Sequence, residues 1–281
     1  MPRALLVMVL FLIGGCLAPQ GWRPSFEVSA LAATQYNRRG MVENERGVAQ
    51  GEAKTRLPVP FGGAFQLKAW ANMDLTQHTG DAWFPDGHGG EVTEVDLTGS
   101  YGRPVGPLDL SAGWTTYVLP HGNEFLNGDR PTTGEVFAAI GADVLPESSF
   151  GFYPLFIAFY DPVEVDGFYL NAGVSKGWGL TEDLRLILGA SLGYSEENHS
   201  LWTYGFEAAG FTDLRGTLTL EYRVTDTVTL AAGVAASTIL DDEIREWVEH
   251  RAIVERRSDG TLKRGIDTDT VWGTLGVSWR F

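Results

Sequence analysis

The sequence is poor in cysteine and in positive charge. Cys16 is the only cysteine among 281 residues, so the chain can form neither an intramolecular disulfide nor a cysteine-based zinc site. Lysine and arginine number 21 against 36 acidic residues, which gives a formal net charge of −15. Such an acidic chain is a poor candidate for binding the phosphate backbone, and we expect no nucleic-acid partner.

After residue 18 the sequence lacks any apolar run of about 18 residues, the length that a membrane helix needs. The one long apolar run, 4–13, follows a basic residue and precedes small residues. This layout is typical of a secretory signal peptide, so we divide the chain into a signal peptide (1–18) and a mature domain (19–281). Two processing routes stay open, which are ordinary cleavage near Ala18 and lipidation of Cys16 in a lipobox-like stretch.

The mature sequence alternates apolar with polar or small residues. The segments 184–194, 214–223 and 228–238 each place their large apolar residues on one face of an extended strand. Alternation alone fits a soluble sandwich as well as a membrane barrel. Two features favour the barrel, because the strands are about ten residues long or longer and short turns alternate with mostly longer loops.

We therefore predict an all-β fold, a single antiparallel transmembrane β-barrel of about twelve strands in the outer membrane of a Gram-negative cell. The predicted strands are 25–37, 47–57, 64–75, 91–102, 108–119, 132–144, 149–160, 167–179, 184–195, 212–223, 228–240 and 270–281. The segment 47–57 is polar for a lipid-facing strand and is included partly because an even count requires it.

Aromatic residues gather near the predicted strand ends, where rings meet lipid headgroups. One set lies near the short turns, and comprises Phe26, Phe65, Tyr101, Phe150, Phe152, Trp178, Tyr222 and Trp279. A second set, toward the long loops, comprises Tyr36, Trp114, Tyr160 and Tyr194. The last strand alternates cleanly and ends on Phe281, which is similar to the insertion signal that the barrel-insertion machinery reads in outer-membrane proteins.

Four segments carry a narrower resemblance. They are Trp70-Ala71-Asn72-Met73-Asp74, Glu94-Val95-Asp96 continuing to Tyr101, Gly113-Trp114 continuing to Leu119-Pro120, and Thr133-Gly134-Glu135-Val136. Together they resemble an uncharacterised family of bacterial outer-membrane barrels that share a Glu-x-Asp strand, a Tyr-Pro-like strand end and a following Glu. The chain departs from that pattern at Ala71 and Thr115. The resemblance covers about residues 25–195 and implies the barrel fold, while function stays open.

Alternation also predicts which charged side chains face the lumen. These are Lys54, Arg56, Lys68, Asp74, Glu94, Asp96, Asp109, Glu135, Arg215, Glu221 and Arg223. An inward charge needs water or a partner, so two interpretations compete. One is a narrow, porin-like, acid-lined channel for small polar or cationic solutes. The other is a non-conducting structural barrel, filled by pairs between these carboxylates and Lys54, Arg56, Lys68 and Arg215.

Enzymatic and metal-binding functions have weaker support, and we expect no enzyme, cofactor or metal. The five histidines fall in predicted loops, and no nucleophile, base and orienting group can be assembled for a lipid-acting barrel enzyme. The stretch His78–Glu91 mixes His, Asp and Gly but has no recognised cation-binding spacing. In the charged loop 241–269, Ile244, Trp247, Val248 and Ala252 recur at helical spacing, which predicts a short helix over the mouth. The expected partners are outer-membrane lipids, the insertion machinery and small solutes.

Overall fold

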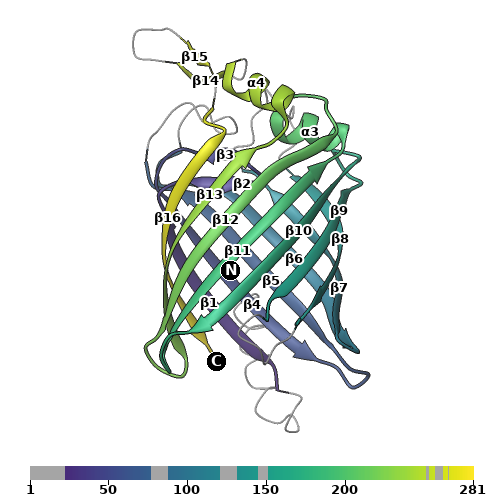
Figure 1. Cartoon of the computed structure of the whole chain (residues 1–281), viewed down its shortest axis with the longest axis vertical. Coiled ribbons are helices and arrows are strands. Elements are labelled where there is room, and N and C mark those ends of the chain that lie inside the picture. Colours follow the sequence, from purple (N-terminus) through teal and green to yellow (C-terminus); the bar gives the residue numbers. More distant parts are fainter. Residues whose placement is uncertain are drawn as a thin grey trace.

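The computed structural model describes residues 23–76, 88–120, 132–144, 151–250, 253–256, 262–264 and 266–281, and the predicted signal peptide with Cys16 lies outside them. These residues form a closed antiparallel barrel of twelve strands, as the alternation predicted (Figure 1). The barrel strands are β1 (Ser25–Ala33), β4 (Val48–Pro58), β5 (Ala64–Asp74), β6 (Val92–Val105), β7 (Leu108–Val118), β8 (Thr132–Ala142), β9 (Tyr153–Asp161), β10 (Gly167–Gly179), β11 (Leu184–Ser195), β12 (Gly210–Arg223), β13 (Val228–Ile239) and β16 (Asp269–Arg280).

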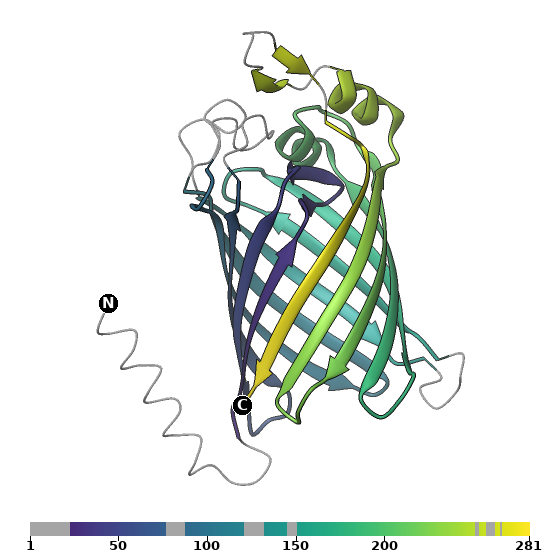
Figure 2. The ribbon, with the colours of Figure 1, turned by 90° about the vertical axis from the view of Figure 1, so that its left-hand side faces the viewer.

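Neighbouring strands in the sequence pair with each other, and β1 closes the ring. It pairs with β4 on one side and with β16 on the other. The polar segment β4 is thus a full member of the barrel, and the even count holds. Short turns join the strands at the end where the chain terminates, while the long connections gather at the opposite end (Figures 1 and 2). By this asymmetry we name the first end periplasmic and the second end outer.

The outer surface of the barrel is apolar. Leu67, Leu97, Leu188, Leu218 and Leu275 are each more than two-fifths exposed, and comparable side chains occur on every barrel strand except β4. A soluble protein would bury such residues, whereas lipid solvates them. The exposed apolar belt therefore marks the membrane-facing surface.

The first outer connection departs from the sequence prediction. The strand expected over 25–37 ends at Ala33, and the chain then folds a separate two-stranded hairpin from β2 (Tyr36–Arg38) and β3 (Met41–Asn44). Figure 2 shows this hairpin (dark purple) at the outer end of the barrel. Tyr36, expected at the outer aromatic rim, is half-buried inside instead, where its ring lies 5.6 Å from that of Trp70.

The remaining elements cover the outer end (Figure 1). They are α3 (Glu197–Tyr204), α4 (Asp242–His250), β14 (Ile253–Arg256) and β15 (Leu262–Arg264). The helix predicted in the last loop is confirmed as α4, with Ile244 and Val248 buried, although Ala252 lies outside the described residues. The described helices are both too short and too polar to cross a membrane.

Candidate functional site: a hairpin held inside the barrel

The tip of the hairpin requires an uncommon backbone conformation. Arg39 and Gly40 connect β2 to β3 as a two-residue loop, and both have positive φ, 49° and 81°. Two successive positive φ values match the twist of a hairpin, but they strain a residue that has a side chain. A Cβ on Gly40 would also lie 2.7 Å from Cβ of Asp213, so only glycine fits there.

The strained residue Arg39 is held by an extensive set of contacts. Its Nη1 and Nη2 donate to Oε1 and Oε2 of Glu135 at 2.7 and 2.8 Å. The guanidinium lies over the rings of Phe159 and Tyr169, at 4.9 and 4.5 Å from their centroids. The carbonyl oxygen of Arg39 accepts a hydrogen bond from Tyr204 on α3 at 2.5 Å. These contacts offset the strain, because a bidentate arginine–carboxylate pair is among the stronger hydrogen-bonded pairs in proteins.

His199 of α3 completes the surroundings of Arg39. Nη1 of Arg39 lies 2.5 Å from Nε2 of His199, and Nδ1 of His199 lies 2.6 Å from Oγ of Ser195. Since the guanidinium can only donate, Nε2 must accept, and the proton of the neutral imidazole sits on Nδ1. Burial and the charge of Arg39 accordingly hold the pKa of His199 well below 6.5. The sequence predicts a loop at His199, and no pattern in it indicates α3.

Arg38 forms a second clamp one residue earlier. It donates to Glu43 on the other arm of the hairpin and lies 3.9 Å from Oε1 of Glu94 on β6. Tyr36 donates to the other oxygen of Glu94 at 2.9 Å. Glu43 and Glu94 are almost completely buried. Burial raises the pKa of Glu43 to about 7, with Glu94 adding to the rise and Arg38 opposing it.

An apolar cluster seals the hairpin against the outer elements. Its buried members are Met41, Val42, Leu119, Tyr204, Ile239, Ile244, Val248 and Ile266. The cluster joins β3, α3, α4 and three barrel strands or their flanks into one small core. The outer half of the barrel interior is therefore packed like a soluble protein core.

Several charged residues expected in the lumen meet partners that the sequence did not indicate. Glu94 and Glu135 contact Arg38 and Arg39 of the hairpin, rather than lysines or arginines of neighbouring barrel strands. Asp74 is buried and accepts from Asn72 at 3.3 Å. Asp96 lies across the ladder from Trp70 and Tyr117.

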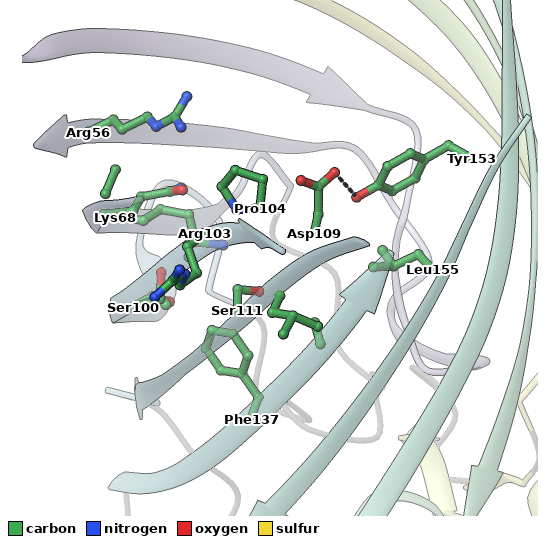
Figure 3. A pocket seen from close by; sticks show the side chains of 16 residues that line it. Arg56, Lys68, Ser100, Arg103, Pro104, Asp109, Ser111, Phe137, Tyr153 and Leu155 are labelled. Atoms are coloured by element: carbon green, nitrogen blue, oxygen red, sulfur yellow. Dashed lines mark hydrogen bonds between the residues drawn. The ribbon is translucent and has the colours of Figure 1, made fainter. Parts of the chain in front are cut away.

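The other predicted residues, apart from Arg215, lie nearer the periplasmic end. Nζ of Lys54 is 2.8 Å from Oε1 of Glu27, and Nζ of Lys68 is 4.0 Å from Oε2 of Glu52. Oε2 of Glu221 lies 3.9 Å from Nη1 of Arg185, and Nη2 of Arg223 lies 2.8 Å from Oδ1 of Asp183. Oδ2 of Asp109 accepts from the hydroxyl of Tyr153 at 3.3 Å (Figure 3). Arg56 and Arg215 have no ion-pair partner among the described residues, and both line cavities.

Three cavities lie inside the barrel below the hairpin. The periplasmic cavity, about 390 Å³, is bounded by Arg56, Lys68, Phe137 and other residues of β4–β9 (Figure 3). The middle cavity, about 260 Å³, shares Tyr153 and Leu155 with it. The upper cavity, about 320 Å³, shares Arg215 and Thr217 with the middle one and also touches Tyr36 and Asn37. The three spaces thus adjoin one another from the periplasmic half of the barrel to the hairpin.

No catalytic or metal site emerges from the described residues. Ser195 and His199 are hydrogen-bonded, but the far side of the imidazole faces a guanidinium rather than the carboxylate that a catalytic base requires. No group of three His, Cys, Asp or Glu side chains in the described part is placed to hold a metal ion. The stretch His78–Glu91 lies mostly outside the described residues, although Nδ1 of His88 is 3.1 Å from Oε2 of Glu91.

No protein-family model matches the sequence, and no curated protein is similar to it. Among solved structures, an outer-membrane channel of Pseudomonas putida F1 superposes with a TM-score of 0.53 at 9% identity, over 92% of this chain and 95% of that one. The NanC porin gives a TM-score of 0.49 at 8% identity, over 90% and 98% of the two chains. The KdgM porin gives 0.43 at 8% identity, over 92% and 99%.

The likeness to the Pseudomonas channel concerns the fold alone, because identity is so low. Together with the closed barrel and its apolar outer belt, it defines the class of this chain as a bacterial outer-membrane β-barrel protein. Within that class it is a twelve-stranded barrel with an internal hairpin clamped by two adjacent arginines.

Proposed function

We propose that the protein is a narrow outer-membrane channel for small polar solutes, and that the β2–β3 hairpin is its constriction. The observation that carries this proposal is the row of three adjoining cavities that ends at Tyr36 and Asn37 of the hairpin. A barrel with a purely structural role has no need of such space, because side chains can fill a barrel of moderate size.

The hairpin supports a role in control because polar contacts hold its tip, whereas Met41 and Val42 of one arm and Tyr36 of the other pack against apolar side chains. Arg38 and Arg39 neutralise Glu94 and Glu135. These are two of the carboxylates from which the sequence predicted a cation-favouring lumen. These two carboxylates therefore no longer support a preference for cations, and the proposed solutes are small polar molecules. Solute passage would require the hairpin to shift, while the barrel wall stays intact.

The proposal also assigns roles to residues named from the sequence. Those proposed to line the lumen are Lys54, Arg56, Lys68, Asp74, Glu94, Asp96, Asp109, Glu135, Arg215, Glu221 and Arg223. Phe281 is proposed as the signal for the barrel-insertion machinery. Residues 1–18 are proposed to direct export, with Cys16 as the lipidation site in one of the two processing routes.

A non-conducting structural barrel is the second candidate. The packed outer half favours it, since Glu43, Glu94, His199 and Tyr204 are all nearly inaccessible. This candidate predicts that the hairpin fills space and controls nothing.

Conductance in planar bilayers separates the two candidates. One variant replaces residues 35–45 by a short Gly-Ser linker, and a control places the same linker in the periplasmic turn 225–227. We expect the hairpin variant to conduct at least about fivefold more than the unchanged protein, because conductance follows the narrowest cross-section. The control should behave like the unchanged protein.

Folding of each variant is checked by the heat-dependent shift in gel mobility that intact barrels show. An unchanged, folded protein that conducts no more than a detergent blank would overturn the channel proposal and favour the structural barrel, because removal of a space-filling hairpin raises conductance under either candidate.

A further inference from the structure

The described walls of the three cavities carry charge of mostly one sign. The lining includes the cationic residues Arg56, Lys68, Arg103 and Arg215, and a single carboxylate, that of Asp109. This balance is opposite to that of the whole chain, whose net charge is −15. Charge of one sign on the wall of a partly enclosed space concentrates ions of the other sign there.

Arg215 lies at the centre of this arrangement. It lines both the middle and the upper cavity, and its guanidinium is 5.0 Å from the ring of Trp272. Its Nε is buried and has no hydrogen-bond partner, and no carboxylate of the described residues lies within ion-pairing distance. By contrast, Arg39, Arg185 and Arg223 each have a carboxylate partner.

An unpaired guanidinium inside a barrel is costly unless a counter-charge reaches it. Its planar, forked donors match the two oxygens of a carboxylate better than they match a spherical ion. The chemistry of Arg215 therefore favours a carboxylate as the counter-charge.

The periplasmic cavity also carries cationic side chains with few or no ion-pair partners, nearer the periplasmic end of the barrel. Arg56 and Lys68 come from the neighbouring strands β4 and β5, and both line the same wall (Figure 3). Arg56 has no ion-pair partner among the described residues, and Lys68 has only the distant contact with Glu52. The one acid of this cavity, Asp109, is engaged by Tyr153.

The remaining surfaces of these cavities are aromatic or aliphatic. Phe137, Tyr153 and Leu155 line the periplasmic cavity together with the cations (Figure 3). In the upper cavity, Trp272 lies beside Arg215. A cavity of roughly 150 Å³ is enough to hold benzene, and the three cavities measure about 260 to 390 Å³. Each of them has space for a ring that carries a carboxylate.

We propose that these cavities form an anion-binding path that takes small ring-bearing carboxylates, with Arg215 as the central binding residue and Arg56 and Lys68 nearer the periplasm. This inference builds on the proposed channel function and names its solute class. It replaces the expectation of cationic solutes, since two of the acids behind that expectation, Glu94 and Glu135, contact the hairpin arginines.

Isothermal titration calorimetry of the full-length barrel in detergent micelles tests the inference without requiring conduction. The probes are benzoate, its neutral analogue benzamide and its cationic analogue benzylamine. We expect benzoate to bind at least about tenfold more tightly than either analogue, and its affinity to fall with added salt.

Substitutions locate the site. Arg215→Gln should weaken benzoate binding by about tenfold or more, because it removes the charge and one donor pair, while Arg215→Lys should retain part of the affinity. The matched control is Arg185→Gln on the adjacent strand β11, because Arg185 is paired with Glu221 and lines none of the three cavities. The control should bind benzoate like the unchanged protein.

Equal binding of the three probes, no binding of benzoate, or equal effects of Arg215→Gln and Arg185→Gln would each overturn the inference. Bilayer conductance is measured separately. Benzoate binding in a barrel that never conducts would support the anion site and reject the channel. Conduction without preferential benzoate binding would reject the anion site and leave the channel.

Discussion

Arg39 combines a strained backbone with a side chain that is engaged on every side. Its positive φ is tolerated because Glu135, His199, Phe159 and Tyr169 fix the guanidinium. Strain of this kind persists only where the surroundings determine the conformation fully. Arg39 therefore has little conformational freedom, and its substitution should loosen the hairpin more than the barrel wall.

The substitution Arg39→Met should destabilise hairpin docking by about 3–5 kcal/mol, since it leaves Glu135 buried without its partner. Hydrogen exchange of residues 36–44, followed by mass spectrometry, should report faster exchange there and unchanged exchange in β10–β13. The double variant Arg39→Met/Glu135→Gln should recover part of the loss.

Arg223→Gln is the matched control for that substitution. Arg223 and Asp183 form their ion pair at the periplasmic rim, with both side chains half exposed, so the cost should stay below about 1 kcal/mol. Uniformly fast exchange throughout the barrel in Arg39→Met would show that the clamp stabilises the wall, contrary to this account.

The alternation of apolar and polar residues predicted that Glu94 and Glu135 lie on barrel strands and face inward, but it could not indicate their partners. Arg39 precedes Glu135 by 96 residues and His199 by 160. Alternation describes one strand at a time, whereas these pairs depend on a loop that folds back inside the closed ring. The sequence predicted Arg38 and Arg39 in the loop between the strands 25–37 and 47–57, and the glycine that follows was the only local sign of a tight turn.

At the scale of elements, the hairpin should respond to pH through Glu43. The charged and titratable groups that act on it are Arg38, Arg39 and Tyr36 of the hairpin and Glu94 on β6. The pKa of Glu43 is raised from 4.5 to about 7, so the folded hairpin favours the protonated carboxyl. The stability that Glu43 contributes to hairpin docking is therefore complete below pH 4.5 and is lost as the pH rises through about 7.

Hairpin docking should consequently weaken between pH 4.5 and about pH 7, by up to roughly 3 kcal/mol. His199 acts in the opposite direction, because its lowered pKa removes stability as the pH falls below 6.5. Comparison with Glu43→Gln isolates Glu43, since His199 is common to both proteins. Exchange of the hairpin amides, corrected for intrinsic rates, should rise less with pH in Glu43→Gln, and identical profiles would contradict the role of Glu43.

The two helices differ in how readily the sequence revealed them. Ile244, Trp247 and Val248 recur at helical spacing, and α4 indeed buries two of them. The residues of α3 are mostly polar and have no comparable spacing, because its buried face consists of His199, Ser200, Thr203 and Tyr204. A helix whose buried face is polar apart from Tyr204 leaves no apolar pattern to recognise.

At the scale of the whole molecule, the barrel could be predicted because lipid imposes the same alternation on nearly every strand. Leu218 illustrates this rule, since it faces outward between Leu188 and Val234 on the adjacent strands. Leu218→Arg should destabilise the folded barrel by about 2–4 kcal/mol, because it places a charge in hydrocarbon.

Thr219→Arg, one residue further, is the matched control, since Thr219 lines the upper cavity. Its cost should be less than about 1 kcal/mol, because the new charge meets an aqueous space. Urea unfolding in lipid vesicles, followed by tryptophan fluorescence, compares the two. Equal losses of stability would contradict the assignment of inner and outer faces.

The internal hairpin also has a consequence for biogenesis. Synthesis proceeds from the N-terminus, so Arg38 and Arg39 emerge long before the strands that carry Glu135 and the helix that carries His199. The wall itself is incomplete until β16, the last strand, joins β1. The first outer loop therefore cannot complete its contacts until α3 has been synthesised, and the wall closes around it only when β16 pairs with β1.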